Sequence, residues 1–202
     1  MMKELLTGEE AAGLLQLGVR AKIYGKDGEL KREDPWRRSE SLLEAFMLLL
    51  ETAFESTNKT VQDTSDTGRT AAGPNNASTS WIELDAAAAN ANFGLLVGTG
   101  TTTPVIDDYN LETKIAHGTG AGQLSYGSVS LFPTRVVGSN LEVRIHRGFT
   151  NGSGGSITIH EIGLAVFNQG VYYFLIAHDL YDLTIDDGDL AVIEYKIITS
   201  TT

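Results

Sequence analysis

Residues 140–167 read NLEVRIHRGFTNGSGGSITIHEIGLAVF, and this stretch decides how the chain folds. In its first half the apolar side chains share one parity and polar ones take the other; the apolar set is Leu141, Val143, Ile145 and Phe149. A period of two indicates a strand with one buried face. The loop at 151–155, NGSGG, contains glycines that adopt the positive φ a tight turn requires. We therefore expect a long hairpin at the centre of a β-sheet.

The second half of this stretch changes phase, from Ile157 and Ile159 to Ile162 and Leu164. Such a change indicates a β-bulge, and Gly163 lies beside it.

A hairpin that turns at Gly154 sets Arg147 opposite Glu161. Both positions have the parity of the buried face, and two charges that point inward need each other. We predict a buried pair of Arg147 and Glu161. The alternative is that the bulge turns one of the two side chains to solvent.

Further strands are predicted on both sides of this hairpin. The candidate strands of the C-terminal half are residues 123–132, 140–150, 156–167, 171–178 and 190–200, and a short buried strand is predicted at 93–97. Many strands with Gly-rich turns between them favour a mainly β fold. We expect an antiparallel, jelly-roll-like β-sandwich over residues 81–202.

The first 60 residues are expected to form a helix–hairpin–helix appendage. Thr7 and Glu10 form a capping box, which predicts a short helix over residues 8–17. Alternation and a Gly-rich turn predict a small hairpin from strands at 19–24 and 29–32.

A long helix is predicted for residues 35–55, because Asp34 is a good N-cap and Pro35 fits the first turn. Its apolar stripe is wide, so part of it is expected to contact another subunit. The candidate oligomer contacts are Leu42, Phe46, Leu49 and Leu50. Residues 61–80 are polar and are interpreted as a linker or arm.

Composition limits the function. The chain has 202 residues, no cysteine and a formal net charge of −11, so it has no disulfide, thiol nucleophile or Cys-based metal site. An acidic body argues against nucleic acid as a partner. The apolar run at 42–54 contains Glu44 and Glu51 and is too short to span a membrane.

No catalytic, cofactor-binding or metal-binding motif is complete. The Gly-rich segments 98–100 and 118–122 lack the lysine of a phosphate loop, and we interpret them as flexible loops between strands. Three aspartates, Asp186, Asp187 and Asp189, lack calcium-loop spacing and are interpreted as a turn, with a weak calcium site as the alternative. We expect no enzyme activity, no cofactor and no bound metal.

Several segments resemble structural proteins of tailed bacteriophage virions. The segments are Leu96–Pro104 (LVGTGTTTP), Asp107–Glu112 (DDYNLE), His117–Gly127 (HGTGAGQLSYG), Phe149–Asn151 (FTN), Glu161–Leu164 (EIGL) and His178–Leu180 (HDL). The resemblance implies a β-rich capsid, neck or tail component without catalysis. It also implies a homo-oligomer that contacts other virion proteins, is made in the host cytoplasm and resides in the virion.

Two other functions remain open. The first is a carbohydrate- or receptor-binding module of a phage fibre, which a surface cluster of Tyr172, Tyr173 and Tyr181 would favour and burial of these rings would oppose. The second is a hydrolase on a β scaffold, which requires carboxylates that converge in a cleft.

Overall fold

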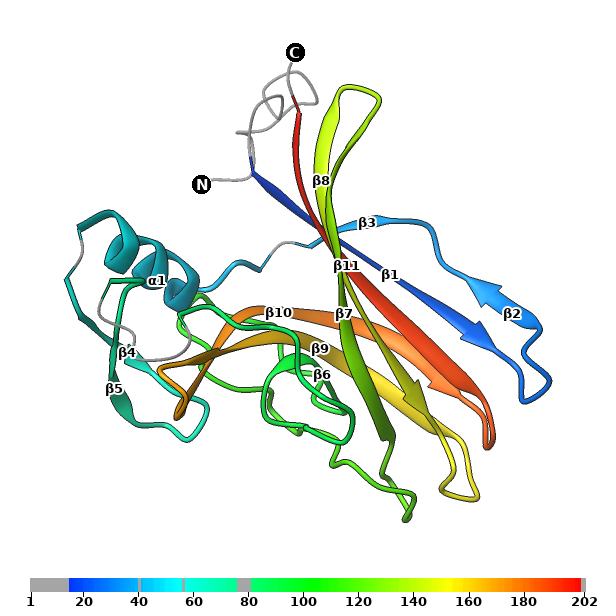
Figure 1. Ribbon diagram of the computed structural model, residues 1–202. Helices are drawn as coiled ribbons and strands as arrows, with labels where there is room; N and C mark the ends of the chain where they lie inside the picture. Colours follow the sequence, from blue (N-terminus) through cyan, green and yellow to red (C-terminus); the bar gives the residue numbers. More distant parts are fainter. Residues whose placement is uncertain (1–14, 40, 56, 76–80, 201–202) are drawn as a thin grey trace.

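The computed structural model describes residues 15–39, 41–55, 57–75 and 81–200, which are mainly β (Figure 1). All pairings between named strands are antiparallel. The first elements are β1 (Gln16–Tyr24), β2 (Leu30–Glu33), β3 (Arg37–Ser39), α1 (Glu44–Glu55), β4 (Lys59–Gln62) and β5 (Gly68–Ala71). They are followed by β6 (Gly94–Gly98), β7 (Ser125–Val137), β8 (Asn140–Thr150), β9 (Ile157–Asn168), β10 (Tyr172–Ile185) and β11 (Leu190–Ser200).

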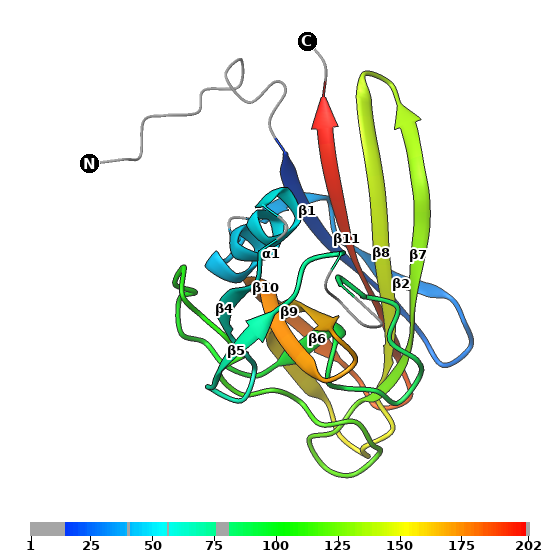
Figure 2. The same ribbon diagram turned by 60° about the vertical axis from the view of Figure 1, so that its left-hand side comes forward.

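The strands form two main sheets and a separate hairpin. The larger sheet has the order β2-β1-β11-β8-β7, with β3 also paired to β1, and the smaller sheet has the order β10-β9-β6. The larger sheet lies across the smaller one, and α1 and the β4–β5 hairpin lie together at one end (Figures 1 and 2). The predicted mainly β, antiparallel fold is therefore confirmed.

One hydrophobic core joins the two sheets. Alternate residues of β1 and β11 are buried in it, as are residues of β9 and β10. The apolar set from the larger sheet includes Leu17, Val19, Ile145, Phe149 and Ile193. At the interface the Tyr195 hydroxyl donates to Asp179 Oδ2 over 2.7 Å, so a buried polar contact also links β11 to β10.

The predicted hairpin at 140–167 is wrong, because its two strands belong to different sheets. β8 pairs with β7 and β11, whereas β9 pairs with β10 and β6. The loop between them crosses from one sheet to the other and is fixed by the buried Asn151, whose Nδ2 donates to the carbonyls of Gly155 and Ile185. The Gly188 amide donates in turn to the Asn151 carbonyl, so the β8–β9 and β10–β11 crossings between the sheets lie side by side.

The predicted β-bulge lies on β10 instead of β9. Pairing with β6 runs along β9 without a shift from Glu161 to Ala165, and the register shifts occur at Leu175–Ala177 and Leu180–Leu183 of β10. The phase change in the sequence has another cause. β9 is the middle strand of the smaller sheet and is buried on both faces from Glu161 to Val166, so the alternation of apolar residues stops there.

The predicted long helix is also wrong in its first half, because α1 starts only at Glu44. Residues Arg37–Ser39 form β3 instead and pair with β1. Arg37 packs over the Tyr181 ring at 3.8 Å, and the Ser39 hydroxyl donates to the buried Asp179 over 2.7 Å. These contacts with β10 keep the segment extended where local signals favour a helix.

The predicted division at residues 60 and 80 does not match the topology. β1 and β2 form the predicted hairpin, but β1 also pairs with the C-terminal strand β11 and so belongs to the main sheet. The predicted helix over 8–17 lies largely outside the described residues, and Gln16 and Leu17 are already part of β1.

The segment interpreted as a polar arm forms the β4–β5 hairpin over its described part. Val61 is buried there, and the Thr64 amide donates to the Tyr173 carbonyl of β10. The Asn168 side chain donates to the Ala72 and Trp81 carbonyls. Among the described residues, no helix has both the length and the apolar character needed to cross a membrane.

Candidate functional site

The candidate site is built around the buried carboxylate of Glu161 in β9. Its carboxylate is fully buried and accepts four hydrogen bonds. Oε1 accepts from the amides of Gly100 and Thr113 at 2.9 and 2.7 Å. Oε2 accepts from the amide of Glu112 at 2.9 Å and from Nε2 of His178 at 3.0 Å. Burial by itself raises the pKa of Glu161, but these donors outweigh burial and lower it.

Two glycines make room for this carboxylate. A Cβ at Gly98 would overlap the Glu161 side chain, and one at Gly100 would lie 2.7 Å from Glu161 Oε1. The Gly98–Gly100 segment therefore brings one backbone amide, that of Gly100, to an anion, and the anion is the protein's own carboxylate. The expected flexible loop is in fact bound along its length, since Glu112 Oε2 also accepts from the amides of Thr101 and Thr102.

His178 joins Glu161 to a second carboxylate. Its Nδ1 lies 2.7 Å from Asp108 Oδ2, and the side chain is almost completely buried. Ionised carboxylates only accept hydrogen bonds, so between two ionised carboxylates both ring nitrogens donate and the ring is an imidazolium. Burial lowers the pKa of His178, but the bonds to Glu161 and Asp108 outweigh it and raise the pKa above its ordinary value. We call Glu161, His178, Asp108 and Glu112 the Glu161 cluster.

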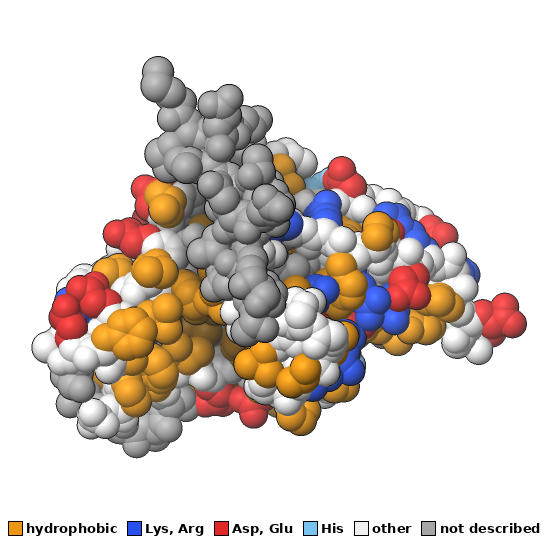
Figure 3. All heavy atoms as spheres, turned by 90° about the horizontal axis from the view of Figure 1, so that it is seen from above, with side chains coloured by type: hydrophobic (Ala, Val, Ile, Leu, Met, Phe, Trp, Pro, Cys, Tyr) orange, Lys and Arg blue, Asp and Glu red, His pale blue; other side chains and the backbone are white. Residues whose placement is uncertain are grey.

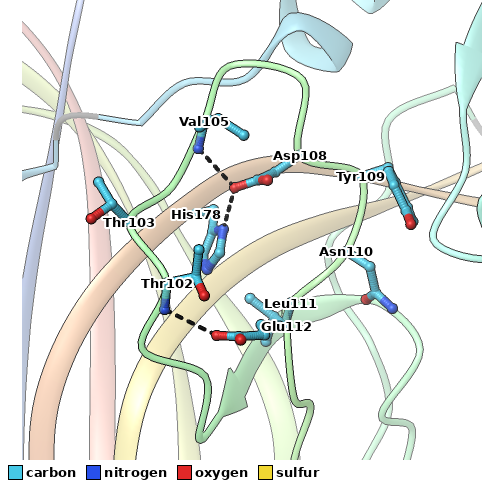
Figure 4. A pocket seen from close by; sticks show the side chains of 9 residues that line it. All are labelled: Thr102, Thr103, Val105, Asp108, Tyr109, Asn110, Leu111, Glu112 and His178. Carbon is cyan, nitrogen blue, oxygen red and sulfur yellow. Dashed lines mark hydrogen bonds and ion pairs between the residues drawn. The ribbon is translucent and has the colours of Figure 1, made fainter.

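The loop that carries Asp108 and Glu112 encloses a polar cavity of about 400 Å³ beside the cluster (Figure 4). The two arms of the loop face each other across it, and His178 lies behind them. The lining residues are Thr102, Thr103, Val105, Asp108, Tyr109, Asn110, Leu111, Glu112 and His178. Asn110 Oδ1 is buried and has no hydrogen-bond partner among the described residues. This buried acceptor is therefore unused within the described part of the chain.

Arg147 does not pair with Glu161, so the predicted pair is wrong. Both side chains are fully buried, as the parity argument required, but they lie in different sheets. The Arg147 guanidinium donates to five backbone carbonyls, those of Gly127, Phe93, Leu95, Ala87 and Asn90. It also packs over the Tyr126 ring at 4.8 Å. Burial lowers the pKa of Arg147 to about 10, which leaves it charged at neutral pH.

The remaining acidic turn is used within the fold. Ser156 Oγ donates to Asp186, the Gly154 amide donates to Asp187, and Lys31 donates to Asp189. Within the part of the chain that the structure describes, no group of three His, Asp or Glu side chains is arranged to hold a metal ion.

The tyrosines named for a receptor-binding surface are packed against the core. Tyr181 is buried, and its hydroxyl donates to Asp34. Tyr173 stacks on Phe93 and Phe167, and Tyr172 is partly buried against the core. These positions count against a surface cluster of aromatic rings.

The candidate oligomer contacts, three on α1 and Leu42 just before it, are only partly available. Leu49 is fully buried in the core of one subunit, and Leu42 and Phe46 pack partly against that core. Leu50 is half-buried. The exposed apolar side chains of the helix are Met47 and Phe54, which are 61% and 82% exposed.

Sequence reasoning identified Glu161 as an inward charge but missed its partners. The signal for the missing partners was present. Two glycines end the β6 segment, and His178 lies in a run of otherwise apolar strand residues. The comparisons with known proteins found no family model, no curated protein and no solved structure that matches the chain. Its function therefore has to be argued from this geometry.

Proposed function

We propose that the chain is a non-enzymatic structural protein of a tailed-phage particle that assembles with copies of itself and with other virion proteins. In this proposal it is made in the host cytoplasm, resides in the virion as a capsid-associated, neck or tail component, and contacts neither nucleic acid nor membrane. In the same proposal, the two unequal sheets form a jelly-roll-like β-sandwich.

The observation that carries the proposal is where the residues of the resembling segments lie in the structure. The segments that resemble phage virion proteins supply Gly98, Gly100, Asp108, Glu112, Glu161 and His178. All of these residues meet in the Glu161 cluster, where the acid and base groups bind backbone amides or each other. A Glu161 with four donors has no lone pair directed at a substrate, which supports a role of this carboxylate in the fold.

A second observation supports assembly. Exposed apolar side chains gather on α1 and on the neighbouring loop, where Val105 and Ile106 are 56% and 73% exposed. The Glu44 amide donates to the Ile106 carbonyl, so the helix and the loop are adjacent. Figure 3 shows a broad apolar area over the end of the molecule that carries α1. Apolar patches of this kind mark protein contacts.

The test is the composition of purified particles. Phage particles purified by density gradient from cells that express the chain are digested and analysed by mass spectrometry. We expect peptides of this chain in several copies per particle. Recovery of the chain only from the soluble lysate, with none in the particles, would overturn the proposal.

The alternative is a carbohydrate-binding module of a phage fibre, and the polar cavity favours it. The Thr102 hydroxyl and the Glu112 carboxylate lie between the two arms of the loop and suit a ligand rich in hydroxyl groups. Saturation-transfer NMR with a panel of monosaccharides tests this function, with Thr102→Val as the matched variant. Transfer to a sugar that disappears in Thr102→Val supports the alternative, and no transfer to any sugar rejects it.

A further inference from the structure

The outer face of the larger sheet has a charge opposite to that of the whole molecule. The chain carries 26 acidic and 15 basic side chains. On this face, however, a groove is lined by the cations Arg20, Lys22, Lys26 and Arg144, with His146, and by a single carboxylate, Glu194. A basic groove on an acidic protein selects for an acidic partner.

The groove has an apolar floor and aromatic walls. Its volume is about 800 Å³, and it runs over β11, where Leu190 and Val192 lie on its floor. Tyr24 of β1 lines one side. Phe132 of β7 lines the other and contacts the ring of His146 edge to face, with centroids 4.7 Å apart. Figures 1 and 2 show β1, β11, β8 and β7 side by side in this order.

Three carboxylates hold the cations of this face in place, and two of them, Glu142 and Glu194, are buried. Arg20 donates to Glu33 at 2.8 Å and to Glu194 at 3.0 Å. Arg144 donates to Glu142, which is 4% exposed and also accepts from Arg135. Because these side chains are already ordered, they lose little rotamer entropy when a ligand binds, and the entropic cost of binding is small.

More positive charge gathers above the groove than the face neutralises. Arg20, Arg144 and Lys196 all pack against the ring of Trp36, at 4.6, 5.6 and 4.3 Å. Within the described residues, neither Lys196 nor Lys26 forms an ion pair. Burial, together with the neighbouring cations Arg144 and Arg20, lowers the pKa of Lys196, although Glu142 opposes the shift.

We propose that this groove binds an extended, acidic segment of a partner protein. The floor from Leu190 to Glu194 spans about 13 Å at the rise of a strand, which accommodates a segment of about five residues. Acidic side chains of the segment meet Lys26, Lys22 and Arg144, and its apolar side chains face Leu190 and Val192. The acidic segment would belong to a partner in the proposed assembly. The inference rests on the proposed function only in identifying that partner as a virion protein.

Nucleic acid fits the same groove less well. A single strand that follows the groove leaves it within a few nucleotides and then meets a protein surface with a net charge of −11 over the whole chain. The apolar floor also offers nothing to phosphates, whereas an alternating acidic and apolar peptide uses both parts of the groove.

The experiment measures binding of labelled peptides to the full chain by fluorescence anisotropy. The probe alternates Glu and Val, its matched control carries Gln in place of each Glu, and an oligothymidine of equal charge is the third probe. We expect the Glu peptide to bind at least tenfold more tightly than the Gln peptide. This preference is lost between about 0.1 M and about 1 M salt, where the Debye length falls from about 10 Å to about 3 Å.

A pair of matched variants locates the site. Lys26→Gln removes a groove cation without an ion pair, and Lys22→Gln/Lys26→Gln removes two; we expect the affinity to fall about threefold and about tenfold. Lys59→Gln is the control, since Lys59 lies in β4 and binds Glu51 and Glu55. Thermal melts confirm that every variant folds.

Three results would overturn the inference: equal affinity for the Glu and Gln peptides, an equal loss in Lys59→Gln, or tighter binding of the oligothymidine. Self-association of the chain that the Glu peptide reverses supports it and identifies a second copy as the source of the acidic segment. Peptide binding needs no phage particle, so a failure here is distinct from absence of the chain from particles.

Discussion

At the scale of single residues, the charge state of the Glu161 cluster follows from its donors. Glu161 accepts hydrogen bonds from three amides and from His178, and His178 lies between two carboxylates. Removing one charge is therefore expected to leave its partners buried and uncompensated. The cluster joins β9 and β10 to the loop that contains Gly100, Asp108 and Glu112.

Glu161→Gln is expected to lower the free energy of unfolding by about 3–5 kcal/mol, because the amide cannot accept from all four donors and leaves His178 with one carboxylate. Urea unfolding measures this loss. Glu112→Gln is the matched control, and its loss should be smaller because two exposed amides can bind water instead. A change below about 0.5 kcal/mol in Glu161→Gln would mean that the carboxylate is not buried.

Stability should also depend on pH through His178. Its pKa is raised in the folded chain, so its contribution is complete below the unfolded value of about 6.5 and is lost as pH rises through the folded value. The lowered pKa of Glu161 has the opposite sign, and its contribution disappears as pH falls from about 4.3 through the folded value. Melting temperatures from pH 5 to 9 should therefore decline on the alkaline side. The same decline in His178→Gln would assign it to another group.

At the scale of elements, strands were easier to predict than their partners. Residues 140–150 and 190–200 coincide with β8 and β11, because one buried face produces alternation in the sequence. The alternation does not indicate which sheet a strand joins. The crossing of β9 into the smaller sheet depends on a contact between Asn151 and Gly188, which are close in space but far apart in sequence. The helix prediction failed over Arg37–Ser39 because contacts with Tyr181 and Asp179 outweigh the local preference for a helix after the N-cap residue Asp34. The cluster itself joins residues from three separate segments, the loop at 108–112, β9 and β10, which no spacing rule connects.

Arg147→Met should detach the segment before β6. The substitution leaves the carbonyls of Ala87, Asn90 and Phe93 without their buried donor, so hydrogen exchange over residues 86–95 should accelerate. Mass spectrometry of exchanged peptides measures this, with residues 157–162 as the internal reference. The effects of Arg147→Met and Glu161→Gln on unfolding should add within about 0.5 kcal/mol, since the two side chains share no hydrogen-bond partner. A larger interaction energy between the two substitutions would support the buried pair predicted from the sequence.

At the scale of the whole molecule, three surfaces differ in character. The body is acidic, the outer face of the larger sheet carries the basic groove, and the end with α1 is apolar (Figure 3). A molecule with surfaces of opposite kinds at different places can contact several neighbours at once without competition between them.

Self-association should depend on the exposed side of α1. Met47→Lys/Phe54→Lys changes two exposed side chains and should leave the melting temperature nearly unchanged while it reduces the sedimentation coefficient to that of a monomer. Leu131→Lys is the control, since Leu131 is 48% exposed on β7. By contrast, Leu49→Ala should destabilise the monomer itself by about 2–5 kcal/mol. Sedimentation of the unaltered chain as a monomer at all concentrations would contradict the oligomer.

The pairing of β1 with β11 sets the order in which the chain can fold during synthesis. Arg20 and Glu194 bond to each other across 174 positions of sequence. A ribosome must therefore release β11 before the larger sheet can close, and until then the edges of β1 and β8 remain open. Sheet closure then becomes a late step, because folding rates fall as the sequence separation between contacting residues increases. A nascent chain of this protein is thus exposed to aggregation until β11 has left the ribosome, and chaperone binding should persist until then.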